Sequence, residues 1–314
     1  MTDPGPTGAR TAGVNVTITG ATGRIGGRIV AALQERGDTV TVLSRDPERA
    51  AAALGVEALA WQPEAEAAPS AALAGRDAVV HLAGEDVAQR WSADAKRRLL
   101  ASRELGTRNL VAGLAAAEPR PGVLVSSSAV GFYGPRGDEP VTEQTPPGDD
   151  FLAGICRAWE REAEAAERLG VRVVRVRTGV VLDKGGGALE KMLPFFKLGV
   201  GGPVAGGRQY LPWIHVDDLV SMYLAALDGA GWSGAVNGTA PEPVTNKEFS
   251  RALGRALHRP AFAPVPGFAV RALYGEMADI VVHGQRAVPE RPLALGFAFA
   301  HPRLDEALES ALAA

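Results

Sequence analysis

Short apolar runs alternate with helical stripes along the first 180 residues of the chain. The β-branched run at residues 14–19 ends at Gly20, which is typical of a buried strand, and residues 24–36 carry apolar positions at helical spacing. The same patterns predict strands at 39–43, 78–82, 122–126 and 171–176, and helices at 92–117 and 151–169. This alternation predicts an α/β fold with a doubly wound parallel sheet of the Rossmann type.

The pattern changes near residue 180. Glycine-dense turns at 185–187 and 199–207 are followed by short helices and turns that several prolines interrupt. We therefore expect a dinucleotide-binding domain at 14–180 and a smaller, mainly helical C-terminal lobe at 181–314. Residues 208–240 are expected to contribute to the sheet, through a strand and helix between Ile214 and Leu227. Residues 1–13 lack bulky groups and are expected to form a loose tail.

Composition narrows the possible functions. The 314 residues carry a net charge of −3, which provides no basic surface for nucleic acid or for anionic lipid. A single cysteine excludes an internal disulfide and suits a reducing compartment, so a cytoplasmic location is expected. The predicted partner is a small-molecule substrate, with no metal ion, and the chain is expected to be a monomer or a homodimer.

The segment Gly20-Ala21-Thr22-Gly23-Arg24-Ile25-Gly26 follows the first strand and opens the first helix, which is the context that gives such a glycine triplet meaning. The first glycine permits a tight turn, the second lets a diphosphate approach the backbone, and the third lets helix and strand pack closely. The free N–H groups at the start of the helix favour the phosphate charge. We therefore expect a nicotinamide dinucleotide to bind here.

The end of the second strand indicates which cofactor is preferred. An acidic residue there binds the 2′-hydroxyl of NAD, but this chain has Ser44-Arg45. A hydroxyl and a guanidinium suit a 2′-phosphate, so NADP(H) is favoured over NAD(H), although Asp46 follows at once. A surface arginine without a ligand is the alternative. In the segment His81-Leu82-Ala83-Gly84, small residues let the backbone pass close to a cofactor, and His81 is expected to be structural.

Together these segments resemble the extended short-chain dehydrogenase/reductase superfamily. More narrowly, the chain resembles the atypical epimerase/dehydratase group whose members carry a small C-terminal domain of the DUF1731 type, here at about 260–312. The matching segments are Thr19–Gly26, His81–Glu85, Ser102–Thr107, Ser126–Gly134, Arg177–Leu182, Gly185–Gly187, Trp213–Asp218, Gly275–Met277 and Gly284–Arg286. Besides the glycine turn, the resemblance implies cofactor contacts at Ser44, Arg45, Leu82, Ala83, Arg103 and Val181. Arg103 stands near the position where extended relatives have an asparagine, and a helix-surface arginine is the alternative interpretation.

The catalytic motif of the superfamily is incomplete. Ser128 lies at the end of the strand predicted at 122–126, where the family serine orients the substrate oxygen, but Cys156 and Glu160 occupy the positions of the catalytic tyrosine and lysine. A thiol is shorter than a phenol, and a neighbouring carboxylate raises its pKa, so Cys156 is expected to be a small buried residue. The candidates for proton transfer are Glu160, as a buried base, and His215, which titrates near neutral pH. A structural role is the alternative for Ser128 and for His215, and Tyr133 is expected to be structural.

Two classes of function follow from this mismatch between an intact cofactor turn and an incomplete catalytic motif. The first is an NADP-dependent oxidoreductase or epimerase-like enzyme that acts on a small carbonyl or alcohol. The second is a cofactor-binding sensor or interaction module without turnover. A third, weaker hypothesis is redox sensing through Cys156.

Overall fold

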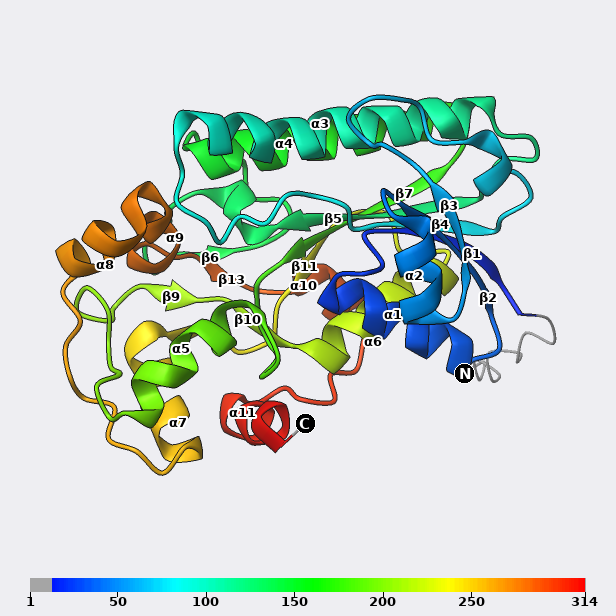
Figure 1. The fold of residues 1–314 in the computed structure, drawn as a ribbon. Helices are drawn as coiled ribbons and strands as arrows, with labels where there is room; N and C mark the ends of the chain where they lie inside the picture. The colour runs from blue at the N-terminus through cyan, green and yellow to red at the C-terminus, as the bar shows by residue number, and fades with distance from the viewer. Residues whose placement is uncertain (1–12, 314) are drawn as a thin grey trace.

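The computed structural model describes residues 13–313, and its centre is a seven-stranded parallel sheet (Figure 1). The strands follow the order β11-β7-β5-β4-β1-β2-β3. Their bounds are β1 Asn15–Thr19, β2 Thr39–Ser44, β3 Glu57–Ala60, β4 Ala78–His81, β5 Val123–Ala129, β7 Arg172–Thr178 and β11 Gly234–Gly238. Chain order reverses on either side of β1 and β4, which is where α/β sheets bind ligands at the carboxyl ends of the strands. Most of the predicted tail lies outside the described residues.

Helices cover both faces of this sheet. The helices α1 (Arg24–Glu35) and α6 (Val216–Asp228) pack together on one face, and α3 (Ala93–Ala116) and α4 (Phe151–Glu164) pack together on the other (Figure 1). The short α2 (Pro47–Leu54) follows β2, and a 3-10 segment, Ala165–Leu169, extends α4. This is the doubly wound Rossmann-like arrangement that the alternating pattern predicted.

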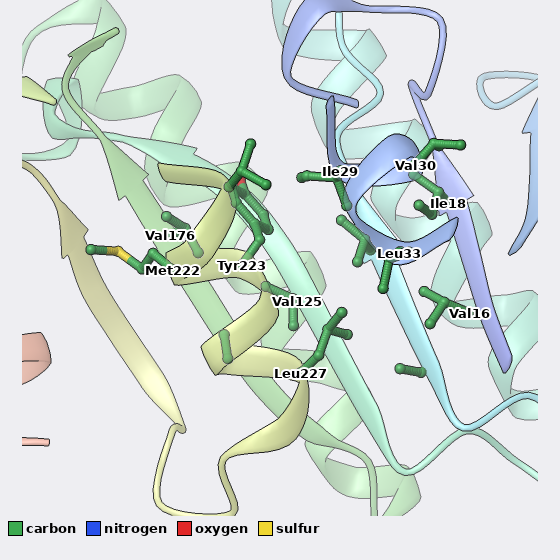
Figure 2. Close-up of a cluster of buried hydrophobic side chains, with 14 of the residues drawn as sticks. Val16, Ile18, Ile29, Val30, Leu33, Val125, Val176, Met222, Tyr223 and Leu227 are labelled. Atoms are coloured by element: carbon green, nitrogen blue, oxygen red, sulfur yellow. The ribbon is translucent and has the colours of Figure 1, made fainter. Parts of the chain in front are cut away.

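The largest apolar cluster lies between the sheet and the α1–α6 layer. Ile18 of β1 and Leu33 of α1 are fully buried, and Figure 2 shows Val125 and Val176 of the sheet near Tyr223 and Leu227 of α6. Burying each such side chain contributes about 1.5–3 kcal/mol. This packing holds the first strand and the first helix rigidly, and the glycine turn connects them.

The rest of the chain forms the smaller lobe and its links to the sheet. Three two-stranded sheets pair β8 (Val180–Leu182) with β10 (Trp213–His215), β9 (Tyr210–Leu211) with β12 (Val244–Thr245), and β6 (Pro140–Val141) with β13 (Arg286–Ala287). The helices are α5 Gly187–Lys197, α7 Asn246–Ala256, α8 Gly267–Tyr274, α9 Asp279–Val282, α10 Glu290–Ala294 and α11 Leu304–Ala313. A separate apolar cluster joins α5, α7 and α11.

Two elements differ from the sequence expectations. Strand β3, with the sequence Glu-Ala-Leu-Ala, carries no β-branched residue and was not predicted; it forms the outer edge of the sheet beside β2. The strand expected at Ile214 exists, but it pairs with β8 in a separate sheet. The strand that residues 208–240 add to the main sheet is β11 instead, which pairs with β7. Among residues 13–313, no helix combines the length and the apolar character needed to cross a bilayer.

Candidate cofactor and active site

The glycine turn between β1 and α1 is so tightly packed that side chains are excluded. Gly20 has φ +70°, and a Cβ at this position would lie 2.7 Å from the backbone of Leu82 and Ala83. A Cβ on Gly26 would lie 2.5 Å from the carbonyl oxygen of Gly20. Helix α1 has no side-chain cap and no acidic residue in its first turn. The first N–H groups of the helix are therefore not capped by a side chain of their own turn, an arrangement that suits a diphosphate.

The exposed part of this turn comprises Thr22, Gly23 and Arg24, with Ile25 half-buried behind them. Arg24 extends across the second glycine-rich turn, because a Cβ on Gly186 would lie only 1.8 Å from its Nε. The turn at 185–187 follows β8, which contains the half-buried Val181. The structure thus brings the loop after β8 to the same edge as the start of α1.

Arg45, at the end of β2, is exposed and makes no ion pair with any residue in 13–313. Its neighbour Asp46 is the N-cap of α2 and accepts a hydrogen bond from the Arg49 backbone N–H at 3.1 Å. Ser44 Oγ is held in the same turn, where it donates to the Asp46 carbonyl at 3.0 Å. The acidic residue after Arg45 is therefore occupied as a helix cap, and the guanidinium is left available for a ligand.

Strand β4 ends at the same edge of the sheet, next to the glycine turn. Leu82 N donates to the Thr19 carbonyl at 3.1 Å and Ala83 N to the Thr19 hydroxyl at 3.3 Å. His81 is fully buried between the hydroxyls of Thr19 and Thr107, at 2.7 and 3.0 Å. Burial, with a smaller effect of the Arg103 charge, lowers the pKa of His81 to about 4. His81 is therefore neutral and has a structural position.

Arg103 on α3 lies directly behind Gly84. A Cβ on Gly84 would be 3.2 Å from the Arg103 guanidinium carbon, which lies 4.9 Å from the centre of the Trp159 ring. Arg103 is almost fully buried, and its only hydrogen bond to a residue within 13–313 runs from Nη1 to the Leu99 carbonyl. Burial lowers the pKa of Arg103. A buried guanidinium with so few partners, at the strand-end edge, favours a ligand anion over a plain helix surface.

Cys156 stands where the superfamily has its catalytic tyrosine. The thiol is buried, and burial, together with the negative charge of Glu160, raises its pKa to about 12. The Sγ atom lies 3.9 Å from the position that a Cβ on Gly131 would take, so the thiol is packed against the turn that follows β5. A neutral, enclosed thiol is a poor proton carrier and a poor nucleophile.

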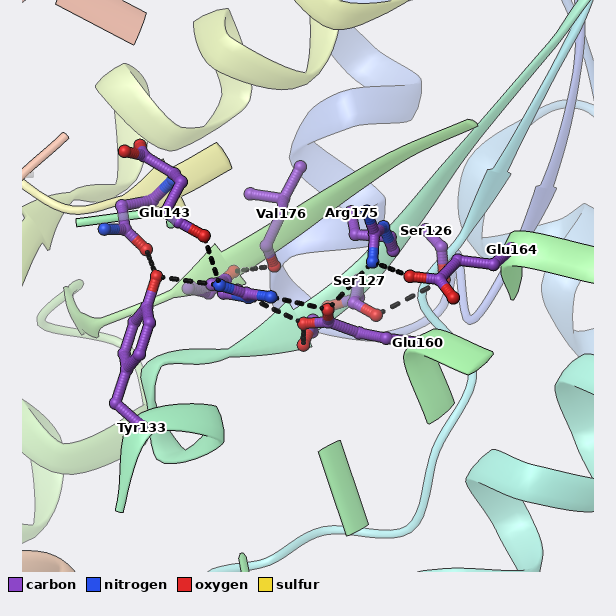
Figure 3. A network of polar contacts seen from close by, with 12 residues as sticks. Ser126, Ser127, Tyr133, Glu143, Glu160, Glu164, Arg175 and Val176 are labelled. Atoms are coloured by element: carbon purple, nitrogen blue, oxygen red, sulfur yellow. Dashed lines mark hydrogen bonds and ion pairs between the residues drawn. The ribbon is translucent and has the colours of Figure 1, made fainter. Parts of the chain in front are cut away.

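Ser128 and Glu160 are brought together by the structure. Ser128 Oγ donates to Glu160 Oε1 at 2.6 Å, and Arg177 donates to both carboxylate oxygens, each at 2.8 Å. Arg175 adds a contact to Oε2 at 3.2 Å (Figure 3). The Glu160 carboxylate is 3% exposed, and both of its oxygens accept hydrogen bonds from guanidinium groups. This geometry argues against the expectation that Glu160 serves as a free base.

Arg177 connects this pair to Tyr133. Arg177 Nη1 donates to the Tyr133 hydroxyl at 3.0 Å, and that hydroxyl donates to Asn237 Oδ1 at 2.6 Å (Figure 3). Burial raises the pKa of Tyr133 to about 12, so its phenol remains a structural group. The sequence reasoning missed Arg177. The available signal was the pattern of β7, in which Arg172, Arg175 and Arg177 interrupt an otherwise apolar central strand.

His215 lies in a different cluster. Its Nδ1 accepts the Asp217 backbone N–H at 3.2 Å and so caps α6, while its ring stacks on His301 at 3.8 Å between centroids. Within residues 13–313, the charged groups that influence its ring are His301, Asp217, Asp218 and Arg28, and it makes no hydrogen bond to Ser128 or Glu160. The structure therefore does not join His215 to the serine.

The residues His215, Asp217 and His301 could in principle hold a metal ion, since one ligand atom of each lies within 4.8 Å of the others. However, His215 Nδ1 already caps the helix, and the positive end of α6 disfavours a cation. The cluster is explained as a helix cap.

These features define a class of protein: a Rossmann-like α/β protein of the short-chain dehydrogenase/reductase type, with a glycine turn at the edge of its parallel sheet. The sequence model of the "NAD dependent epimerase/dehydratase family" matches residues 16–237, and that of the "Domain of unknown function (DUF1731)" matches residues 265–311. The chain therefore belongs to the NAD dependent epimerase/dehydratase family, in the extended short-chain dehydrogenase/reductase group, and carries a C-terminal DUF1731 domain.

Individual relatives span nearly the whole chain. The Arabidopsis thaliana protein "Epimerase family protein SDR39U1 homolog, chloroplastic" is 41% identical over 95% of this chain and 86% of its own length. Bacillus subtilis "Epimerase family protein YfhF" is 36% identical, covering 96% and 98%. The crystal structure of human epimerase family protein SDR39U1 (isoform 2) with NADPH has a TM-score of 0.84 at 37% identity, covering 94% and 98%. MoeE5 in complex with UDP-glucose and NAD, at 20% identity, shares the fold.

Proposed function

We propose that this chain binds NADP(H) and is an oxidoreductase or epimerase-like enzyme that acts on a small carbonyl or alcohol. The observation that carries the cofactor choice is Arg45, an exposed guanidinium at the end of β2 without an ion-pair partner in residues 13–313. The NADPH in the related human structure supports the same choice. Two more distant structural neighbours contain NAD, and they support only a dinucleotide cofactor in general.

Each group at the sheet edge has a defined part in this proposal. The amides of the turn from Gly20 to Gly26 hold the diphosphate, with Thr22, Arg24 and Ile25 shaping its surface. Ser44 and Arg45 contact the 2′-phosphate. The cofactor lies close to the uncharged residues Leu82, Ala83, Gly84 and Val181, and Arg103 contributes a positive charge.

When bound, the nicotinamide supplies or accepts hydride at the substrate carbon. Ser128 orients the substrate oxygen, and its own orientation is fixed by Glu160, because its hydrogen is directed to that carboxylate. The lone pairs of the hydroxyl are thereby left to accept a hydrogen bond. Ser128 is thus better suited to bind a substrate hydroxyl, from which it can accept a hydrogen bond, than a carbonyl oxygen, which has no hydrogen to donate.

The second candidate is an NADPH-binding module without turnover. It is favoured by one observation: the position of the catalytic tyrosine holds a buried, neutral thiol, and the position of the lysine holds an ion-paired carboxylate. On this alternative, Ser128, Glu160 and Arg177 form a structural core, and His215 remains a helix cap.

Single-turnover experiments separate the two candidates. Calorimetry first tests whether the protein binds NADPH and NADH. The NADPH complex is then mixed with a panel of carbonyls, and the NADP⁺ complex with a panel of alcohols. The enzyme proposal expects the 340 nm absorbance to fall with carbonyls or to rise with alcohols. Ser128→Ala should lower the rate of this change about 100-fold, as is usual when a proton-orienting group is lost. Tight NADPH binding without any absorbance change across both panels, whether lasting or transient, supports the silent module and overturns the enzyme proposal.

A further inference from the structure

A basic groove of about 770 Å³ runs along α7 in the smaller lobe, away from α1 and the glycine turn (Figure 1). Its wall carries Lys247, Arg251, Arg255 and Arg259, and Phe262 stands at its side. None of these residues belongs to the strand-end edge described above. The groove therefore needs its own explanation.

The positive charges are aligned. Lys247, Arg251 and Arg255 are spaced four residues apart on α7, which places them on one face with an axial rise of about 6 Å between neighbours. Arg259, beyond the end of the helix, lines the same groove. Adjacent phosphates of one ligand can be contacted by successive members of such a row.

Most of this charge is not neutralised by the protein. Of these four side chains, only Arg255 forms an ion pair with a residue in 13–313, namely Asp305 at 2.6 Å. Arg259 donates to two backbone carbonyls, those of Lys197 and His258, at 3.2 and 3.4 Å. The Lys247 and Arg251 side chains make no ion pair or hydrogen bond with another residue of the described chain.

The carboxylate of Glu248, on the same helix, is already engaged. Its Oε2 accepts from both the backbone N–H and the hydroxyl of Thr245, in the capping box that begins α7. The row of cations is therefore a local positive surface on a chain whose net charge is −3. The nearby anions are Asp305, which pairs with Arg255, and Glu248, which interacts with the charge of Arg251. The four positive side chains exceed these two carboxylates, and the surplus favours an anionic ligand.

The side of the groove adds an aromatic surface. The Phe262 side chain is 81% exposed, which is unusual for a large apolar ring that lines a concave site. A planar heterocycle that stacks on this ring would cover it. A guanidinium group suits phosphate better than an ammonium group does, because two of its N–H groups can bind two phosphate oxygens at once.

The dimensions select among anionic ligands. A volume of about 770 Å³ falls in the range of small-molecule sites, and its concave shape does not match a flat membrane or a duplex. We propose that this groove is a second ligand site, which binds a nucleotide with two or more phosphates: the phosphates contact Arg251, Arg259 and Lys247, and the base stacks on Phe262. The site is separate from the proposed NADP(H) edge.

Calorimetry on protein saturated with NADPH tests the site, with ADP and inorganic tripolyphosphate as probes. We expect both probes to bind, and Arg251→Gln to weaken both about tenfold or more, as the loss of a charge-assisted contact implies. Phe262→Ala should weaken ADP alone, because tripolyphosphate has no ring. Arg97→Gln, at another highly exposed arginine, on α3, is the matched control and should change neither.

Three outcomes overturn the proposal. The first is no binding of either probe to NADPH-saturated protein. The second is binding that Arg251→Gln leaves unchanged, and the third is tighter binding of an acidic peptide or anionic vesicles than of ADP through the same residues. Because Arg251 is exposed, the variant should fold, and its melting temperature confirms this. NADPH affinity is measured first, so a failure at the proposed cofactor edge is recognised separately.

Discussion

The Ser128 hydroxyl donates to the Glu160 carboxylate across 2.6 Å, in a pair that is almost fully buried. In the family motif, the residue at the position of Glu160 is a lysine that assists a tyrosine. Here the same turn of α4 presents a negative charge, which β7 balances with Arg177. On the proposed correspondence with the family motif, an ion-paired carboxylate that holds the serine hydroxyl stands where a lysine is expected.

Glu160→Gln should lower the free energy of unfolding by about 3–5 kcal/mol, because it leaves the Arg177 guanidinium buried without its counter-charge. Urea denaturation measures the change. Glu164→Gln is the control: Glu164 is 45% exposed, and its contact with Arg175 should contribute about 1 kcal/mol or less. Equal effects of the two substitutions would contradict the importance that we assign to the buried pair.

Arg45→Gln should weaken NADP(H) binding about tenfold or more and leave NAD(H) binding nearly unchanged, because only the former carries a 2′-phosphate. Titration calorimetry with both cofactors gives the ratio. Arg168→Gln, another exposed arginine, should leave both affinities as they are. Parallel losses for the two cofactors would place Arg45 away from the 2′ position.

Gly26→Ala should abolish dinucleotide binding and destabilise the fold, since the new Cβ would be 2.5 Å from the Gly20 carbonyl oxygen. The neighbouring Gly27→Ala brings a Cβ to 3.6 Å from the Ala21 carbonyl oxygen, an ordinary contact. That substitution should preserve binding and raise stability by up to about 1 kcal/mol through helix propensity. Thermal unfolding with and without NADPH distinguishes the pair, and a tolerated Gly26→Ala would refute the packing argument.

Cys156 should resist thiol reagents in the native protein. Its pKa is raised to about 12 and its side chain is buried, so the thiolate is scarce at pH 8. Iodoacetamide labelling followed by mass spectrometry should require denaturant, and Cys156→Ser should leave NADPH affinity unchanged. Rapid labelling of folded protein would revive the hypothesis of redox sensing.

Acid should destabilise the protein through His81. The pKa of His81 is about 4 in the folded protein, below the ordinary 6.5 of the unfolded chain. Between these two values the unfolded chain binds a proton that the folded protein does not, which favours unfolding. Stability is therefore lost as pH falls from about 6.5 toward 4. Urea unfolding at pH 7 and pH 5 should show the decrease, and His81→Asn should reduce it. An unchanged pH dependence in His81→Asn would assign the effect to other groups, such as the buried His215.

The sequence predicted best those features that a single residue type dictates. The glycine turn was predictable because only glycine fits at Gly20 and Gly26. The partners of Glu160 were not, because Arg175 and Arg177 approach it from another strand, and spacing along the chain carries no information on that contact. Strand β3 was missed because hydrogen bonding to β2, and not the propensity of its residues, makes it extended.

Strand β11 completes the sheet only after the polypeptide has left it to build β8, α5 and β10. A fragment ending at residue 180 would contain the glycine turn, Arg45 and Ser128, yet it would lack both the edge strand and helix α6. The apolar side chains of Val125 and Val176 would then face water. Residues 14–180 consequently do not bury their own sheet completely, and we expect a fragment ending there to be less stable than the whole chain.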